Sequence, residues 1–220
     1  MKIIEQSYRI LWNRGDIIEQ AARTCYRSED KITDDGLSDR KLKEMLIFLN
    51  HGAMLEHSTL SVEFTTDRAI ANELVRHRLC SFAQESTRYC NYSKNKFGNE
   101  LTFVKPEWLR EKLDLEMKTS PGSHKYKYED SLWVDTCVIA EHNYMALLAN
   151  GLKPEDARCV LPLSLATKLV MTTNYREWRH ILKLRTAKGA HPQMRALMIP
   201  LLKELQETIP VIFDDIKVEE

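Results

Sequence analysis

Long apolar runs, glycine-rich motifs and nucleophile motifs are all missing from this sequence. Its most apolar stretches, 46–49 and 210–213, are far shorter than the ~18 residues that a membrane-spanning helix needs. With 7 glycines in 220 residues, it contains neither a GxGxxG motif nor a Walker A phosphate loop. These absences exclude Rossmann dehydrogenases and P-loop kinases. No serine or cysteine lies in a nucleophile-elbow context, which argues against a serine hydrolase.

Paired cysteines are absent as well. The five cysteines are odd in number and widely spaced, and no CxxC pair occurs. This pattern is typical of reduced thiols and differs from a disulfide framework or a structural zinc site. The first residues include Glu5, Arg9 and Arg14 and lack the apolar core of a signal peptide. We therefore expect a cytoplasmic protein with no membrane partner.

A surplus of charge of one sign is also lacking, because 32 Lys and Arg are balanced by 32 Asp and Glu. A dedicated nucleic-acid binder usually carries a basic surplus, since phosphate neutralisation supplies most of its affinity. The cations nevertheless cluster: residues 76–96 hold five cations and one acid, and residues 176–195 hold six cations and one acid. Two basic clusters in a neutral chain favour small phosphorylated ligands over nucleic acid.

Hydrophobic periodicity predicts helices interleaved with a few strands. We expect helices at 16–23, 40–51, 67–78, 131–150, 154–161, 174–185 and from 192 onward, and strands at 1–5, 59–64 and 165–173. The charged segment 105–127, broken at Ser120-Pro121-Gly122, predicts no element. Without strict βαβ alternation, repeats or long linkers, the pattern favours an α+β fold. We predict one domain over residues 1–220, with a small mixed or antiparallel sheet packed against several helices.

The first basic cluster begins with the segment RHRLCSFAQESTRY, residues 76–89. Cations at the end of a helix interact favourably with the helix dipole, which is one explanation for Arg76, His77 and Arg78. The following Ser, Thr and Arg residues also offer backbone N–H groups and a guanidinium fork to a phosphate. The second explanation predicts a nucleotide site.

In the second basic cluster, Arg185 continues an apolar stripe formed by Trp178, Ile181 and Leu182 at helical spacing. An arginine on a buried face is costly without a partner. Either Arg185 extends past the helix end or pairs with a core carboxylate, or it lines a site and contacts an electron-rich ligand.

The segment 51–57 contains His51, Glu56 and His57, which are residue types that bind metals. Their spacing matches no familiar zinc motif. A helix end at Gly52 followed by a strand explains the segment without a metal. We therefore predict no metal site.

Arg76-His77-Arg78, seven further residues and Ser86 resemble the RHR-x7-S signature of the flavin-dependent thymidylate synthases. Further segments follow in the order of that family, at 21–25, 51–57, 157–162, 174–176, 184–185 and 190–193. The similarity runs from about residue 20 to residue 200. It implies an α+β homotetramer with active sites between subunits. The implied reaction methylates dUMP to dTMP, with methylenetetrahydrofolate as carbon donor, FAD as hydride source and NADPH as reductant.

The resemblance also implies roles for individual residues. Arg185 corresponds to the arginine that polarises the uracil ring and favours ionisation at N3, and it would be the catalytic residue. Contacts to dUMP would come from Glu73, Arg76, Gln84, Glu85, Ser86, Thr87, Arg88, Arg158 and Arg185, with Arg158 supplied by a neighbouring subunit. Contacts to FAD would come from Arg76, His77, Arg78, Gln84, Asn174, Arg176, His180 and His191.

Three positions depart from the family pattern. Ala53 stands where members often have Ser or Thr, which removes a hydroxyl contact to the flavin. Gln84 stands where other members carry Glu, and His180 where others have Asn. We expect each of these positions to retain a polar or backbone contact.

Two other functions fit the same basic clusters. One is a non-catalytic regulatory module that binds a nucleotide. The other is a single-stranded nucleic-acid binder that stacks bases on Tyr89, Tyr92 and Phe97. A flavin absorption spectrum would separate the enzyme from both, and we expect no nucleic acid among its partners.

Overall fold

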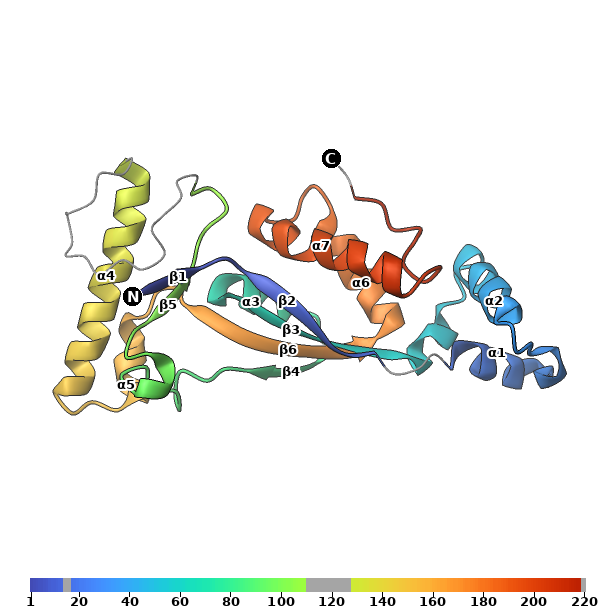
Figure 1. Ribbon diagram of the computed structural model, residues 1–220, viewed down its shortest axis with the longest axis horizontal. Coiled ribbons are helices and arrows are strands. Elements are labelled where there is room, and N and C mark those ends of the chain that lie inside the picture. Colours follow the sequence, from blue (N-terminus) through green and yellow to red (C-terminus); the bar gives the residue numbers. More distant parts are fainter. Residues whose placement is uncertain (14–16, 110–127, 219–220) are drawn as a thin grey trace. The chain divides into compact units, whose positions relative to one another are not determined.

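The computed structural model describes residues 1–13, 17–109 and 128–218 (Figure 1). The chain divides into two compact units. The first unit comprises Met1–Ser7, Phe64–Leu74 and Ala83–Leu169, and the second comprises Tyr8–Glu63, Val75–Phe82 and Val170–Glu220. Several of these boundaries fall inside strands, so single strands contribute residues to both units.

The described helices and strands form an α+β fold, as the sequence predicts. In chain order they are β1 (Lys2–Ile4), β2 (Ser7–Asn13), α1 (Ile18–Tyr26), α2 (Leu37–Phe48), β3 (Thr59–Asp67), α3 (Arg68–Leu74), β4 (Ser81–Gln84), β5 (Thr102–Val104), α4 (Tyr128–Ala149), α5 (Pro154–Ala157), β6 (Ala166–Asn174), α6 (Tyr175–Thr186) and α7 (Pro192–Thr208). Four strands form a sheet in the order β2-β3-β6-β4, and β1 pairs in parallel with β5. None of the helices in the described ranges is long and apolar enough to cross a membrane.

The core of the first unit lies around the β1–β5 pair and helix α4. Ile3 on β1 pairs with Phe103 on β5, and both side chains are buried with Tyr144 of α4. The N-terminal amine of Met1 forms an ion pair with Glu141 of α4 at 2.9 Å. Tyr92 belongs to the same core, so the chain that follows β4 is anchored there.

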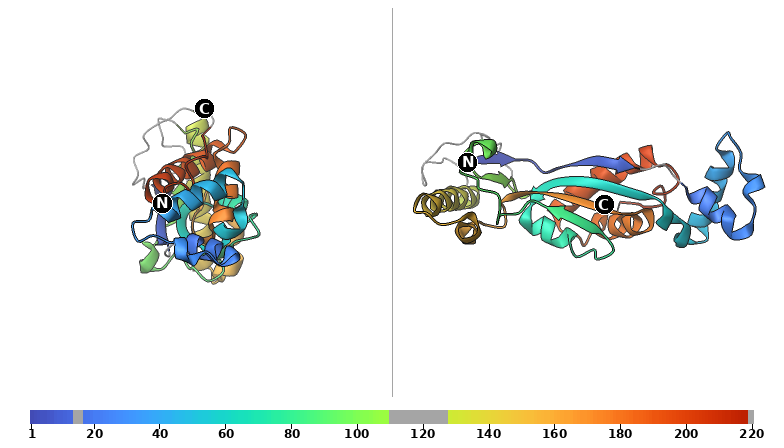
Figure 2. Two further views of the ribbon diagram at one scale, coloured as in Figure 1. Left: turned by 90° about the vertical axis from the view of Figure 1, so that its right-hand side faces the viewer. Right: turned by 90° about the horizontal axis from the view of Figure 1, so that it is seen from below.

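The core of the second unit positions helix α6. Asn174 precedes α6, and its side-chain oxygen accepts a hydrogen bond from the Glu177 N–H at 2.9 Å, which confirms the predicted capped start. Trp178 is fully buried, and its indole N–H donates to the Leu60 carbonyl at 3.0 Å. Helix α7 packs beside α6 (Figures 1 and 2). The cap and the buried ring together fix the rotation of α6.

Several predicted helices begin or end at other residues in the structure; α5, for example, ends at Ala157 rather than at residue 161. Helix α3 ends at Leu74 rather than at residue 78, so Arg76, His77 and Arg78 lie in the turns that follow it. Helix α2 runs over Leu37–Phe48, three residues earlier than predicted, and a 3-10 helix over Gly52–His57 follows it. The predicted helix start at Asp16 and the break at 120–122 lie outside the described residues.

Three strands were not predicted. Strands β4 and β5 have four and three residues, which is too short for an alternating pattern to be recognised. Strand β2 reads SYRILWN, in which Ile10, Leu11 and Trp12 are consecutive apolar residues and hide the alternation.

Candidate functional site

The predicted dUMP loop, residues 84–88, belongs to the first unit. It begins at Gln84, which is the last residue of β4. The Arg88 N–H donates to Ser86 Oγ at 3.3 Å, and the Cys90 N–H donates to the Ser86 carbonyl at 2.9 Å. Gln84 Nε2 donates to Thr167 Oγ1 at 3.4 Å. The chain therefore forms a turn at Ser86 that holds a hydroxyl and a guanidinium two residues apart, a combination suited to a phosphate.

Two arginines that the resemblance places on the dUMP phosphate contact one residue in the first unit. Arg88 Nε donates to Glu155 Oε2 at 2.8 Å, and Arg158 Nε donates to the Glu155 carbonyl at 3.1 Å. The hydrogen bond from Arg88 holds the pKa of the Glu155 carboxyl below its usual range. Because the pair is exposed to water, a phosphate can replace the carboxylate at little cost. Both guanidinium groups therefore contact Glu155, Arg88 at the carboxylate and Arg158 at the main-chain carbonyl.

In the second unit, Arg185 of α6 contacts His77. Its Nε donates to His77 Nε2 at 3.0 Å, and His77 Nδ1 lies 3.8 Å from Glu177 Oε1. The His77 side chain is 6% exposed, and burial, with smaller contributions from Arg185 and His180, lowers its pKa to about 4. The imidazole is therefore neutral near pH 7, so Nε2 can accept from Arg185 while Nδ1–H faces Glu177. One partner of Arg185 on the apolar stripe is thus a neutral histidine.

The same residues bear on metal binding. Within the described part of the chain, His77, Glu177 and His180 have ligand atoms within 4.8 Å of one another. The Nε2 lone pair of His77 already accepts a hydrogen bond from a cation, Arg185. A divalent ion would have to displace that arginine or lie beside its positive charge. We therefore assign no metal to this cluster.

A cavity of about 830 Å³ lies in the second unit among α1, α2 and residues 49–54. Its wall is mainly apolar and carries polar groups from a few residues; the lining includes Leu42, Met45, Leu49, Met54, Arg23, Lys31, His51, Gly52 and Arg176. Arg176 Nη1 donates to Glu56 at 2.6 Å. A Cβ at Gly52 would lie 3.1 Å from Arg176 Nε, so glycine leaves room for this side chain. Such a cavity suits a flat aromatic ring that carries phosphate.

The remaining predicted flavin residues have local structural contacts. The rings of His77 and His180 meet edge to face with centroids 6.1 Å apart. His191 caps α7, because its Nδ1 accepts from the Gln193 N–H at 3.2 Å. Arg76 and Arg78 are exposed.

The predicted site residues fall into two groups, one in each unit. The first unit contains Glu73, Gln84, Glu85, Ser86, Thr87, Arg88 and Arg158, and the second contains Arg76, His77, Arg78, Asn174, Arg176, His180, Arg185 and His191. Sequence reasoning did not predict that Glu56 and Glu155 pair with arginines or that Glu177 lies beside His77. Glu177 gave a local signal, as the third residue after the helix cap. The other two are paired with arginines 120 and 67 residues away, and no local pattern indicates such pairs.

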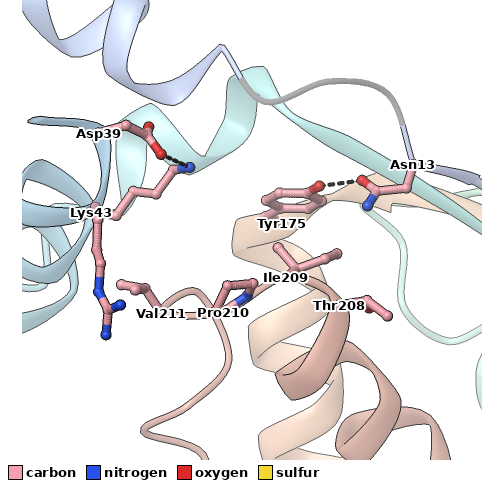
Figure 3. Close-up of a pocket in the computed structure, with 9 residues that line it drawn as sticks. Asn13, Asp39, Lys43, Tyr175, Thr208, Ile209, Pro210 and Val211 are labelled. Atoms are coloured by element: carbon pink, nitrogen blue, oxygen red, sulfur yellow. Dashed lines mark hydrogen bonds and ion pairs between the residues drawn. The ribbon is translucent and has the colours of Figure 1, made fainter. Parts of the chain in front are cut away.

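A second cavity in the same unit, of about 300 Å³, is lined by none of the predicted residues (Figure 3). Lys43 of α2 lines it, but its amine already donates to Asp39 at 2.5 Å. The Tyr175 hydroxyl donates to Asn13. Because these polar groups are paired with one another, we assign this cavity no ligand.

Acidification is expected to destabilise the fold through His77. Its pKa of about 4 in the folded chain lies below the ordinary value of 6.5, so the unfolded chain takes up the proton first as the pH falls. The free energy of unfolding should therefore fall between pH 6.5 and pH 4, by about 1–3 kcal/mol from this residue. Urea unfolding of the wild type and of His77→Gln at pH 7.5 and pH 4.5 measures the difference. Equal losses in the two proteins would contradict the assignment.

Residues 10–211 match the family model described as thymidylate synthase complementing protein. A flavin-dependent thymidylate synthase from Corynebacterium aurimucosum is 34% identical over 203 residues, which cover 90% of this chain and 78% of that protein. The enzyme of the same name from Mycobacterium avium is 29% identical over 205 residues, covering 92% and 79%. Both comparisons extend over almost the whole chain.

Two solved structures have the same fold. A UMP/dUMP methylase, PolB from Streptomyces cacaoi, bound with 5-Br dUMP, aligns with a TM-score of 0.75 and 25% identity over 97% of this chain and 96% of that one. Thymidylate Synthase X from Helicobacter pylori, with FAD and dUMP, aligns with a TM-score of 0.70 and 24% identity, covering 96% and 98%. The family model spans the RHR-x7-S segment, the segment 157–162 that contains Arg158, and helix α6. On this combined basis, the chain belongs to the flavin-dependent thymidylate synthase family.

Proposed function

We propose that this chain converts dUMP to dTMP by flavin-dependent reductive methylation. The observation that carries the proposal is the turn at Ser86, which holds a hydroxyl and the Arg88 guanidinium two residues apart, with the guanidinium bonded to the exposed carboxylate of Glu155. Ser86 is the last residue of the RHR-x7-S signature, which is specific to the family. Relatives of similar length are named for the same activity, and two similar structures carry dUMP or its 5-bromo derivative.

The residues of the second unit fit FAD. The cavity of about 830 Å³ is within the range of small-molecule sites and has an apolar wall for an aromatic ring. Arg176, together with Arg23 and Lys31, supplies positive charge for phosphate groups. Because Ala53 has no hydroxyl, its backbone is the polar group that can contact the flavin at this position. When bound, FAD reduced by NADPH supplies the hydride, and methylenetetrahydrofolate supplies the one-carbon group.

The residues of this chain act by positioning ligands and by stabilising charge. Arg185 polarises the uracil and stabilises the negative charge that develops on it. The neutral His77 accepts from Arg185 without adding a second positive charge. No imidazole or carboxylate in the described ranges is hydrogen-bonded to Ser86 Oγ, so a phosphate contact suits Ser86 better than a role as nucleophile.

We further propose that the enzyme is a cytoplasmic homotetramer whose active sites lie between subunits, with Arg158 supplied by the neighbouring subunit. Large apolar side chains on α1 and α2 support association, because Tyr26 is 82% exposed and Phe48 is 87% exposed. Exposed apolar surface of this kind is typical of protein interfaces. In this assembly, each Arg158 would reach the phosphate held at the Ser86 loop of the neighbouring subunit.

The purified protein is expected to bind FAD and to form dTMP from dUMP. The measurement is a visible absorption spectrum, followed by chromatography of the nucleotides after incubation with dUMP, methylenetetrahydrofolate and NADPH. UMP is the matched alternative substrate, because one similar structure is a UMP/dUMP methylase. A colourless protein that binds dUMP but oxidises no NADPH would instead be a regulatory module. Salt-dependent oligonucleotide binding without a preference for dUMP would favour the nucleic-acid binder.

Replacing Ser86 by alanine is expected to weaken dUMP binding about 10- to 100-fold, because one hydrogen bond to a charged group is lost. The turnover at saturating dUMP should change little. Steady-state kinetics over a range of dUMP concentrations measures both quantities. Ser93→Ala is the matched control, since Ser93 follows the loop and bonds to Asn91 instead. Loss of turnover with unchanged dUMP affinity in Ser86→Ala would indicate covalent chemistry.

A further inference from the structure

Glu85, the second residue of the dUMP loop, is held at three separate atoms within the first unit. Its N–H donates to the Lys168 carbonyl at 2.9 Å, and its carbonyl accepts from Arg68 Nη2 at 3.0 Å. Its Oε1 accepts from the Tyr92 hydroxyl at 2.6 Å. The backbone donor, the backbone acceptor and the carboxylate of this residue are therefore all bound to other parts of the unit.

Tyr92 is itself fixed. Its side chain is 6% exposed, and its ring meets Phe97 with centroids 5.3 Å apart and Tyr144 at 5.8 Å. Burial and the nearby Glu85 raise the pKa of the Tyr92 hydroxyl, which therefore stays protonated as a donor. The 2.6 Å bond to the carboxylate is short, as expected for a charge-assisted hydrogen bond.

Arg68 is fixed in a different way. It is the first residue of α3, and its N–H donates to the Leu163 carbonyl at 2.9 Å. Asp67, just before it, caps the helix by accepting from the Ile70 N–H at 2.7 Å. The Arg68 guanidinium therefore extends from a fixed backbone when it donates to the Glu85 carbonyl.

Ser86 follows Glu85 directly, and Arg88 lies two residues further on. A loop that is already ordered loses less conformational entropy when it binds a ligand. The Glu85 carboxylate itself is a poor partner for a phosphate, because the two charges repel, and its Oε1 is already bonded to Tyr92. The contacts therefore indicate that Glu85 acts on the phosphate indirectly, through the shape of the loop.

We propose that Tyr92 and Arg68 are positioning residues for nucleotide binding: they hold Glu85, and through it Ser86 and Arg88, in the conformation that receives the nucleotide phosphate. This proposal rests on the proposed function, because it takes dUMP as the ligand of the loop. It adds two positioning residues from outside the RHR-x7-S signature, one from α3 and one from the aromatic core.

The first test is Tyr92→Phe, which removes the hydroxyl and keeps the packed ring. The dissociation constant for dUMP, measured by calorimetry on the full chain with bound FAD, is expected to rise at least fivefold. The turnover at saturating dUMP and the flavin content should stay within twofold of the wild type. Tyr144→Phe is the matched control, because it loses a hydroxyl from the same cluster whose contact is to the Cys90 carbonyl at 3.5 Å. Its dUMP affinity should stay within twofold.

A second test uses Arg68→Met and a double-mutant cycle. Arg68→Met should also weaken dUMP binding at least fivefold, with unchanged flavin content. Tyr92→Phe combined with Glu85→Ala should weaken binding no more than Glu85→Ala alone, since both remove the same bond. Glu85→Gln should restore most of the affinity, because its amide oxygen still accepts from Tyr92.

The outcomes distinguish a failure of the proposed function from a failure of the positioning role of Tyr92 and Arg68. If the wild type binds no dUMP, the proposed function fails and the proposal fails with it. If the wild type binds dUMP and both Tyr92→Phe and Arg68→Met bind it equally well, the proposed function stands and the positioning role is wrong. If Glu85→Gln binds as poorly as Glu85→Ala, the negative charge acts on the ligand directly, which also overturns the positioning role.

Discussion

Replacing Arg185 by alanine is expected to lower the rate of dTMP formation by about a thousandfold, whereas dUMP binding weakens by about tenfold. In the proposed mechanism, Arg185 acts on charge that develops on the uracil, and removing one such donor typically costs 10²–10³ in turnover. Binding also depends on the separate group around Ser86 and Arg88, which this change leaves intact. Single-turnover kinetics and calorimetry with dUMP measure the two effects.

Lys183→Ala is the matched control for Arg185→Ala. Lys183 lies on the same helix and is also a cation, but it is 54% exposed and pairs with Asp215 at 3.5 Å. Its loss should leave turnover within about twofold, because exposed ion pairs contribute little. Turnover like that of the wild type in Arg185→Ala would remove the catalytic assignment. Equal losses in the two variants would indicate a general effect of positive charge on the helix.

The position of Arg185 could be predicted because its signals are local. Asn174 and Glu177 mark the start of α6, and Trp178, Ile181 and Leu182 mark its buried face, all within 9 residues of the sequence. Helical geometry then places Arg185 on the same face. The partner of Arg185 could not be predicted in this way. His77 is 108 residues away, and the choice between a carboxylate, a ligand and a histidine depends on tertiary structure.

The end of α3 is a case in which tertiary structure overrides a local pattern. The sequence continues with helix-compatible residues to Arg78, but the helix ends at Leu74. The Leu79 carbonyl instead accepts a hydrogen bond from the Thr173 hydroxyl at 2.8 Å, which holds residues 75–82 against the end of β6. Both residues belong to the second unit. The RHR motif consequently lies in turns, where its side chains and backbone groups are free of the constraints of a helix.

Replacing Trp178 by alanine is expected to lower the free energy of unfolding by about 3–5 kcal/mol. The indole is fully buried, and its N–H donates to the Leu60 carbonyl, so the change leaves a cavity and removes a buried hydrogen bond. In thermal unfolding, a loss of this size should lower the midpoint by roughly 10 °C for a chain of this length. Trp178→Phe keeps most of the volume and should lose about half as much.

The consequence of Trp178→Ala for the site follows from the position of the ring on α6. Trp178 lies between Arg176, which lines the large cavity, and His180, which meets His77, and Arg185 lies two turns further along the same helix. A helix that loses its anchoring ring can shift or rotate, and a displacement of about 1 Å is enough to cost a hundredfold in rate. We therefore expect the soluble fraction of Trp178→Ala to retain less FAD and to have a lower turnover even below its unfolding temperature. If that fraction retained full flavin content and turnover while its unfolding midpoint fell, the cap and the other contacts of α6 would be sufficient to hold it in place.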